Sequence, residues 1–271
     1  MSTKIGFILD ENAPQSEITL PEKADCEIIP QKSLVQIKFP EINKVYTYYN
    51  ELFDLKIGDF VFVDGKLENT MGMVVNITYN FKIKLSDYQR VISKACRNVN
   101  GEFYFAGSHF VSFDPCALPF EQAITWFKAP EKDDEYVCGS DGSSFSFETL
   151  DGLDFDNADL EKGNELFMQN SVEYIELNGT KVRAVVVTSK PYIVEFDYNN
   201  GEISNLYCGC YHITACRHCF AVLYELRQTL MCIEENYAEN FKNSDYFAAI
   251  LKAKFFSFAI DGKTTGGFNL S

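Results

Sequence analysis

Hydrophobic and polar residues alternate along the first part of the chain. A period of two places every second side chain on the same face of a strand. Runs of this kind, each bounded by turn residues, recur within about fifty residues, as the five short strands of a small barrel would. We therefore expect a small β-barrel over 34–98, preceded by an irregular lead-in over 1–33 with a short strand at 5–9. The clearest runs lie at 34–39, 45–49, 58–65 and 72–77.

Elsewhere, apolar residues spaced three or four apart predict helices. Asp156 is the expected N-cap of one helix, because its carboxylate can accept a hydrogen bond from a backbone N–H of the first turn. The helices are expected at 86–95, 119–128, 157–167, 219–230 and 244–258. Strand pairs are expected within 101–113, at 172–177 with 181–187, and at 191–196 with 203–207, the last pair joined by a turn at 199–201. Strands and helices in separate runs predict an α+β fold.

Three cysteines and a histidine cluster directly after the last predicted hairpin. Cys208 and Cys210 flank a glycine at the end of a strand, and Cys216 and His218 follow just before a predicted helix. Three thiolates and an imidazole form a complete tetrahedral ligand set for Zn²⁺. A metal that joins a hairpin to a helix stabilises a unit too small for its own core. We expect a structural site, since these four ligands leave no position for a catalytic water.

Two neighbouring residues leave the fourth ligand open. Cys219 completes a Cys-x-x-Cys spacing with Cys216, and His212 lies inside the loop between the cysteine pairs. Either residue could replace His218, although Cys219 also falls on the apolar stripe of the predicted helix, where a thiol is usually a core residue. His109, the remaining histidine, has no cysteine near it in the sequence and is expected to be structural or exposed.

The composition is that of a folded chain with reduced thiols. Hydrophobic residues make up 46% of the 271 residues, with 24 Phe and 15 Tyr, which is ample material for packed cores. No apolar run approaches the length of a membrane span, and the first residues lack the apolar core and cleavage site of a secretory signal. We therefore expect no membrane partner and a cytoplasmic location, where nine cysteines, an odd number, favour metal binding over disulfides.

Negative charge is concentrated in one segment. The formal net charge is −15, and residues 99–180 carry seventeen acidic against three basic side chains. The acidic stretch at 131–161 is expected to be a solvated linker between two domains, and an acidic surface that imitates nucleic acid for a basic partner stays open. A carboxylate metal site is disfavoured, because the spacing does not match a calcium loop. The carboxylates considered for it are Asp151, Asp154, Asp156 and Asp159.

The cysteine cluster resembles the SWIM zinc finger, whose pattern is Cys-x-Cys, a variable gap and Cys-x-His. The resemblance covers about 156–228 and implies Zn²⁺ held in a ββα unit, with His218 as the fourth ligand. It favours a zinc-finger domain at 156–230, between a mixed α/β connector at 99–155 and a helical extension at 231–271. The residues outside the cluster that follow the family pattern are Leu160, Gly163, Leu166 and Val172, the strands at 184–187, 192–194 and 201–203, and the helix at 220–223.

The N-terminal strands resemble the small SH3-like barrels of bacterial and phage DNA-processing proteins. The resemblance rests on a Gly-Asp-x-Val-x-Val run at 58–63 followed by Gly-x-Val-Val at 72–75. This pattern marks strand and turn positions and indicates a fold rather than a ligand.

SWIM domains occur in chromatin-remodelling ATPases, transposases, recombination accessory factors and ubiquitin ligases, so the resemblance implies binding to DNA or to protein. We expect a non-enzymatic adaptor that binds DNA or a DNA-processing protein through the zinc unit. The alternative is a protein-interaction regulator or inhibitor acting through the acidic stretch 131–161. An enzyme is disfavoured, because the sequence has no P-loop, dinucleotide-binding turn or nucleophile elbow, and no small-molecule substrate is evident. The local positive face would consist of Lys181, Arg183, Lys190 and Arg217.

Overall fold

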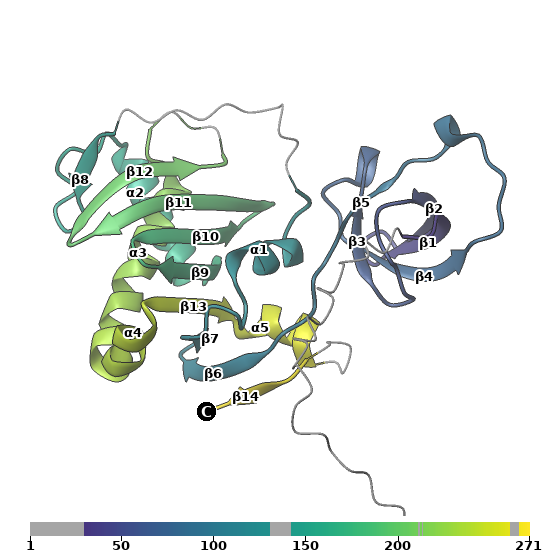
Figure 1. Ribbon diagram of the computed structural model, residues 1–271. Coiled ribbons are helices and arrows are strands. Elements are labelled where there is room, and N and C mark those ends of the chain that lie inside the picture. The colour runs from purple at the N-terminus through teal and green to yellow at the C-terminus, as the bar shows by residue number, and fades with distance from the viewer. Residues whose placement is uncertain (1–29, 131–141, 211, 213, 261–265) are drawn as a thin grey trace, which may run out of the picture.

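The structure is a computed structural model and describes residues 30–130, 142–210, 212, 214–260 and 266–271. The chain forms two sheets with helices packed mainly on the larger one, as Figure 1 shows. This arrangement confirms the α+β class. The short strand expected at 5–9, and the lead-in before residue 30, lie outside the described residues.

The smaller sheet has five antiparallel strands in the order β2-β1-β4-β3-β5. Its core comes from the period-two alternation, since Val35, Ile37 and Phe39 of β1 are all fully buried. The described strands do not form a closed barrel, although an isolated parallel bridge joins Tyr49 to Arg90 beside β5. The strands are β1 (Ser33–Phe39), β2 (Lys44–Asn50), β3 (Phe60–Val63), β4 (Gly72–Thr78) and β5 (Val91–Lys94), with a short 3₁₀ turn, η1 (Gly65–Leu67), after β3.

The helix expected at 86–95 is wrong. This segment holds a single 3₁₀ turn, η2 (Leu85–Asp87), and then strand β5, which pairs with β3. Val91 and Ser93 are buried while the residues between and after them are half-buried, which is a strand pattern. The apolar stripe used to predict a helix was less than three turns long, and β-branched Val91 and Ile92 favour a strand once a partner edge is available.

The larger sheet has nine strands in the order β14-β6-β7-β13-β9-β10-β11-β12-β8. All neighbours are antiparallel except β14 and β6. The three predicted hairpins are confirmed, and Asn200 and Gly201 both take positive φ in the turn between β11 and β12. The strands are β6 (Gly101–Ala106), β7 (His109–Ser112), β8 (Ser144–Ser146), β9 (Val172–Asn178), β10 (Lys181–Val187), β11 (Pro191–Asn199), β12 (Glu202–Cys208), β13 (Tyr246–Leu251) and β14 (Phe268–Leu270).

The helix expected at 244–258 is also wrong over its first half. Strand β13 lies there, inserted between β7 and β9, and it is followed by one helical turn, α5 (Lys252–Phe255), and a π-helical turn, η5 (Phe256–Ile260). Tyr246, Ala248 and Ile250 face one core, whereas Phe247 and Ala249 face the other. A strand buried on both faces has no polar side to reveal its period, so its sequence also fits a buried helix.

Two hydrophobic cores cover the two faces of the larger sheet. Helices α2 (Asn157–Met168) and α3 (Arg217–Cys232) close one face. The other face is covered by α1 (Phe120–Ala123), its 3₁₀ continuation η3 (Ile124–Trp126) and α5, so the helix expected at 119–128 is only partly α-helical. A π-helical segment, η4 (Ile233–Tyr237), and α4 (Ala238–Ser244) follow α3.

The predicted N-cap of α2 is confirmed, because the carboxylate of Asp156 accepts a hydrogen bond from the backbone N–H of Ala158 at 2.9 Å. The helix also packs very closely on α3 at Gly163, where an added Cβ would lie 2.3 Å from the Cβ of Phe220. This glycine therefore brings α2 against the first turns of α3.

Strands from the segments 99–155, 156–230 and 231–271 all belong to the nine-stranded sheet. The domain boundaries drawn from the sequence remain a prediction. The acidic stretch is not solvated throughout, because β8 pairs with β12 as the edge strand of the sheet, and Phe145 and Phe147 are buried. The two sheets touch where Phe60 of β3 packs on Phe258, with 5.5 Å between ring centroids.

Candidate metal centre

The cysteine and histidine ligands come from the end of one hairpin and the start of one helix. Cys208 is the last residue of β12, and the backbone N–H of Gly209 donates to the carbonyl of Ile193 at 3.0 Å, which keeps the turn on the neighbouring strand. Cys216 is the N-cap residue of α3, and His218 lies in its first turn. The sequence therefore places two ligands on each side of the site, as expected.

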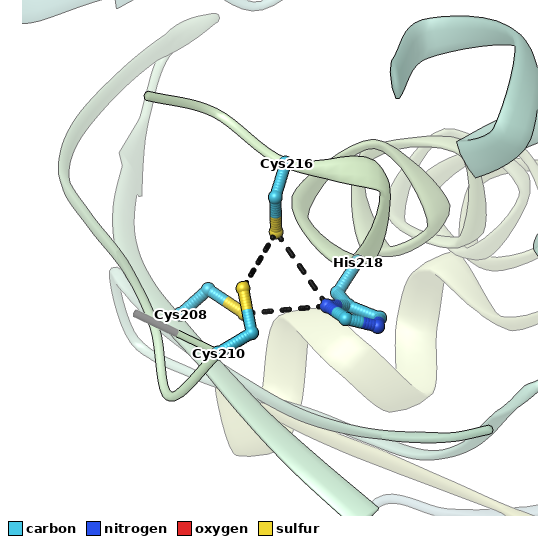
Figure 2. A group of neighbouring side chains, drawn as sticks. All are labelled: Cys208, Cys210, Cys216 and His218. Carbon is cyan, nitrogen blue, oxygen red and sulfur yellow. Dashed lines mark hydrogen bonds between the residues drawn. The ribbon is translucent and has the colours of Figure 1, made fainter. Parts of the chain in front are cut away.

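The four ligand atoms converge, and all lie within 4.8 Å of one another. Figure 2 shows Nδ1 of His218 directed at the sulfurs, 3.8 Å from Sγ of Cys208 and 3.6 Å from Sγ of Cys216. The Sγ atoms of Cys210 and Cys216 lie 3.3 Å apart. A tetrahedral zinc ion with Zn–S near 2.3 Å and Zn–N near 2.0–2.1 Å requires sulfur–nitrogen separations of about 3.6 Å and sulfur–sulfur separations of about 3.8 Å. The group is thus of the right size to hold a metal ion.

Aromatic packing and a loop contact hold this geometry. The imidazole of His218 is stacked on the ring of Tyr192, which projects from β11. The loop before α3 is tied to the segment before α2, because Ala215 forms an isolated bridge with Phe155 and its N–H donates to the carbonyl of Asp154 at 3.3 Å. The sequence pattern did not reveal these supports, because they join residues far apart along the chain.

The thiols share protons unevenly. Hydrogen bonds from Cys208 and then from Cys219 lower the pKa of Cys216, and the same hydrogen bond to Cys216 raises the pKa of Cys208. Burial first of all raises the pKa of Cys210. Within the cluster, the thiol–thiol hydrogen bonds therefore favour the thiolate at Cys216 and the protonated thiol at Cys208.

The two alternative ligands lie outside the converging group. The sulfur of Cys219 is 3.7 Å from that of Cys216, but Cys219 packs among the core residues of α3 with 3% of its surface exposed. His212 is exposed. The His218 side chain, which is 5% exposed, is the imidazole that meets the three thiols.

The basic residues singled out from the sequence do not form a single patch. Arg217 is partly exposed beside His218, and the ammonium of Lys190 lies 5.3 Å from the ring centroid of Tyr192, so these two flank the metal centre. Lys181 and Arg183 share the opposite face of β10, since Val182 and Ala184 of that strand face α3. The four residues therefore divide into two pairs on two faces of the sheet.

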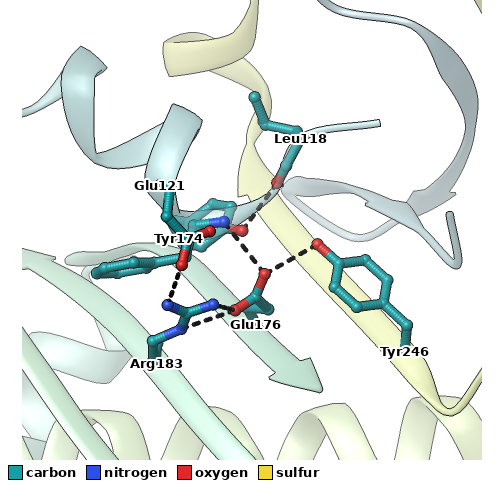
Figure 3. A network of polar contacts seen from close by, with 7 residues as sticks. Leu118, Glu121, Tyr174, Glu176, Arg183 and Tyr246 are labelled. Atoms are coloured by element: carbon teal, nitrogen blue, oxygen red, sulfur yellow. Dashed lines mark hydrogen bonds and ion pairs between the residues drawn. The ribbon is translucent and has the colours of Figure 1, made fainter. Parts of the chain in front are cut away.

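Arg183 is occupied in a buried polar network, shown in Figure 3. Its guanidinium donates to Glu176 at 2.9 and 2.6 Å and to Glu121 at 2.5 Å. Glu176 is 1% exposed and also accepts from the hydroxyl of Tyr246 and the backbone N–H of Phe120, both at 3.1 Å. Burial is the largest cause that raises the pKa of Tyr246, so this hydroxyl stays a donor. Arg183 is therefore a structural residue of the sheet.

The carboxylates considered for a metal site do not converge on one another. Within the described ranges, the Cys₃His group is the one set of three or more such side chains whose ligand atoms meet. Asp156 caps α2, and the carbonyl of Asp154 holds the loop before α3.

No protein-family model, no curated protein and no solved structure matches this chain. Among the residues that the structure describes, no helix combines the length and apolar character needed to cross a membrane.

Proposed function

We propose that Cys208, Cys210, Cys216 and His218 hold a Zn²⁺ ion in a structural site. The observation that carries this proposal is the separation of the four ligand atoms, which suits a tetrahedral ion of zinc size. Three thiolates with one imidazole favour zinc over harder cations such as Mg²⁺ or Ca²⁺. Four protein ligands complete the coordination shell, so the metal would stabilise the hairpin–helix unit and bind no catalytic water.

Metal content tests the zinc site. We expect close to one zinc per chain in the purified protein and a large loss of zinc in Cys208→Ser. Cys116→Ser, which changes an exposed thiol outside the cluster, is the matched control and should keep the metal. An unchanged zinc content in Cys208→Ser, or none in the unsubstituted chain, would contradict the site.

We further propose that this unit is a SWIM-type ββα zinc finger and that the five-stranded sheet is a small SH3-like barrel. The hairpin of β11 and β12 leading into α3 supports the first assignment. The isolated bridge between Tyr49 and Arg90, which brings β2 beside the far end of the sheet, supports the second. The free thiols of the seven described cysteines fit a reducing compartment such as the cytoplasm.

The function that these features support best is a non-enzymatic adaptor that contacts DNA, or a DNA-processing protein, through the surface around the zinc site. Lys190 and Arg217 give this surface a local positive charge within a chain of net charge −15. A strongly acidic chain disfavours unselective nucleic-acid binding, so the contact would be confined to this surface.

Charge reversal on the two faces of the sheet tests the adaptor surface. Lys190→Glu and Arg217→Glu should each weaken the binding of a short labelled DNA duplex at low salt, whereas Lys181→Glu, on the opposite face, should not. Zinc content is measured in each variant, because Arg217 adjoins a ligand. If the unsubstituted chain binds no duplex, capture of a protein partner from the native host should instead depend on Arg217. The proposal is overturned if the chain binds no duplex and Arg217→Glu leaves protein capture unchanged.

The acidic stretch supports a second function, a regulator or inhibitor that captures a basic protein. This proposal is supported by the charge of residues 99–180, which carry seventeen acidic and three basic side chains. Deleting all of 131–161 would also remove β8 and the cap of α2, so a narrower change is needed. Replacing Glu131, Asp133, Asp134 and Glu135 by their amides should abolish capture of the basic partner. Capture that survives this change, with zinc content intact, would exclude this function.

A further inference from the structure

A second candidate site lies at the other end of α3 from the metal cluster. It is a cavity of about 270 Å³ between the C-terminal half of α3, the β6–β7 hairpin, strand β13 and the π-helical segment η4. Helix α3 presents Glu225, Thr229 and Cys232 to it at the spacing of one helix face. The cavity is near the lower end of the range of ligand pockets, about 300–1,000 Å³, so its occupant would be small.

Glu225 is the unusual residue of this cavity. It is 7% exposed, and within the described part of the chain no hydrogen bond or neighbouring charge acts on its carboxylate, whose oxygens still reach the cavity. Burial alone raises the pKa of Glu225 to about 7. A largely buried carboxylate without a protein partner is costly, and such groups in proteins are usually paired or coordinate a ligand.

No neighbouring cation compensates this carboxylate within the described residues. Lys252 lies near the hairpin turn, but its ammonium donates to the carbonyl of Gly107 at 2.7 Å and does not line the cavity. His109 does line it, and its Nε2 donates to the carbonyl of Val172 at 3.1 Å. Burial first of all lowers the pKa of His109, so this imidazole is neutral near pH 7.

The other titratable groups of the wall are neutral as well. Burial is the first cause that raises the pKa of both Cys232 and Tyr237. Glu225 is therefore the one lining side chain that carries a charge once it ionises. The ligand atoms of Glu225, His109 and Cys232 do not converge within 4.8 Å, so a metal ion would lack the ligand number it needs.

We propose that this cavity binds a small organic amine, whose protonated nitrogen pairs with the carboxylate of Glu225. The cation supplies the opposite charge that the wall lacks, and a hydrogen bond between charged groups is stronger than one between neutral groups. The apolar part of the amine lies against Phe247 and Tyr237, which also line the cavity. Aromatic rings beside a cation add a favourable electrostatic contact. This site is independent of the zinc cluster and of the proposed adaptor surface.

Matched pairs of probes test the site on the full, zinc-loaded chain. Butylamine, cyclohexylamine and 2-phenylethylamine are titrated at pH 8, where Glu225 is ionised, and each is compared with the alcohol of the same carbon skeleton. Calorimetry and backbone amide shifts of Val111 and Ala249, which line the cavity, report binding. We expect at least one amine to bind about tenfold or more tightly than its alcohol, as a hydrogen bond between charged groups requires.

Two variants locate the binding. Glu225→Gln keeps the shape of the side chain and should weaken the amine by about tenfold or more, while Glu234→Gln, an exposed acid outside the lining, should leave it unchanged. Ala249→Leu, which fills the cavity and keeps Glu225, should also abolish binding, and it replaces the first variant if Glu225→Gln fails to fold. The proposal is overturned if none of the amines binds, if amines and alcohols bind alike, or if binding persists in the variant that folds.

Discussion

The imidazole of His218 stacks on the phenol ring of Tyr192, with 4.2 Å between the ring centroids and 22° between the ring planes. Tyr192 belongs to β11, the strand next to the one that ends in Cys208, so the sheet itself orients the imidazole of this candidate ligand. The stacked ring sets the direction of Nδ1 toward the three sulfurs. Mutation of residues that orient a metal ligand commonly lowers metal affinity by about 10–100-fold.

Removal of this ring should weaken metal binding. We expect Tyr192→Ala to lower zinc affinity by about tenfold or more, because His218 then loses the surface that fixes its ring plane. Tyr192→Phe retains the ring and should keep the affinity. Competition with a chromophoric zinc chelator measures both variants. Equal affinities in the alanine and phenylalanine variants would show that the stacking has no role in metal binding.

Glu176 should be essential to the stability of the larger sheet. Glu176→Gln leaves the guanidinium of Arg183 with Glu121 as its remaining carboxylate partner, and the side chain of Glu121 is 69% exposed. Removing one partner of a buried ion pair costs roughly 3–5 kcal/mol, because the other charge stays buried without compensation. Urea unfolding measures the loss. Glu173→Gln removes a looser ion pair with Lys254 at 3.6 Å and should lower the free energy of unfolding much less. Equal losses of stability in the two variants would show that the network around Glu176 does not stabilise the sheet.

Glu225 should make stability fall as pH rises through neutrality. Its pKa in the folded protein is about 7, raised from 4.5. Between pH 4.5 and pH 7 the folded state therefore still binds the proton of Glu225, whereas the unfolded state has released it. The contribution of Glu225 to stability is thus fully present below pH 4.5 and is lost as pH rises through 7. Between pH 5 and pH 8, the free energy of unfolding of Glu225→Gln should rise by roughly 2.5 kcal/mol relative to that of the unsubstituted chain.

Unfolding by urea at the two pH values, without added amine, measures this difference. Glu234→Gln is the control, since that side chain is exposed and should show the same pH dependence as the unsubstituted chain. A difference between Glu225→Gln and the unsubstituted chain that does not change with pH would show that Glu225 titrates normally.

Gly163 should not tolerate a side chain. An added Cβ would lie 2.3 Å from the Cβ of Phe220 and 2.9 Å from the carbonyl oxygen of Arg217, so α2 would have to move away from α3. Overpacking of this kind costs about 1–3 kcal/mol, which exceeds the gain of about 1 kcal/mol expected for alanine over glycine in a helix. Gly163→Ala should therefore lower the thermal midpoint, whereas Asn164→Ala, at an exposed neighbouring position, should not. A stabilised Gly163→Ala would mean that the two helices have room to separate.

Local patterns in the sequence were sufficient to predict the hairpins and the Cys₃His cluster. The turn at Asn200 and Gly201 and the cap at Asp156 depend on residues next to one another, and so does the spacing of Cys208, Cys210, Cys216 and His218. Backbone conformation and capping are decided over a few residues, so such features can be derived without knowledge of the partner strands.

Strands β5 and β13 were predicted as helix, because their environment comes from distant segments. The residues of β13 are buried between β7 and β9, and those of β5 pair with β3. Whether the apolar residues of each segment form a strand or a helix is therefore decided by the neighbouring strands of the sheet. A run that is apolar on both faces fits a helix and a strand equally well until its neighbours are known.

The sequence by itself determined the metal-type ligands, the hairpin that carries two of them and the α+β class, because each depends on contacts within a few residues. Only the tertiary structure decided what the charged and aromatic side chains do. Arg183 is paired with Glu121, which is 62 residues away, and Tyr192 supports His218. Glu225 faces a cavity whose opposite wall comes from residues more than a hundred positions earlier. The partner of a buried charge is set by the packing of separate elements, which no local spacing records.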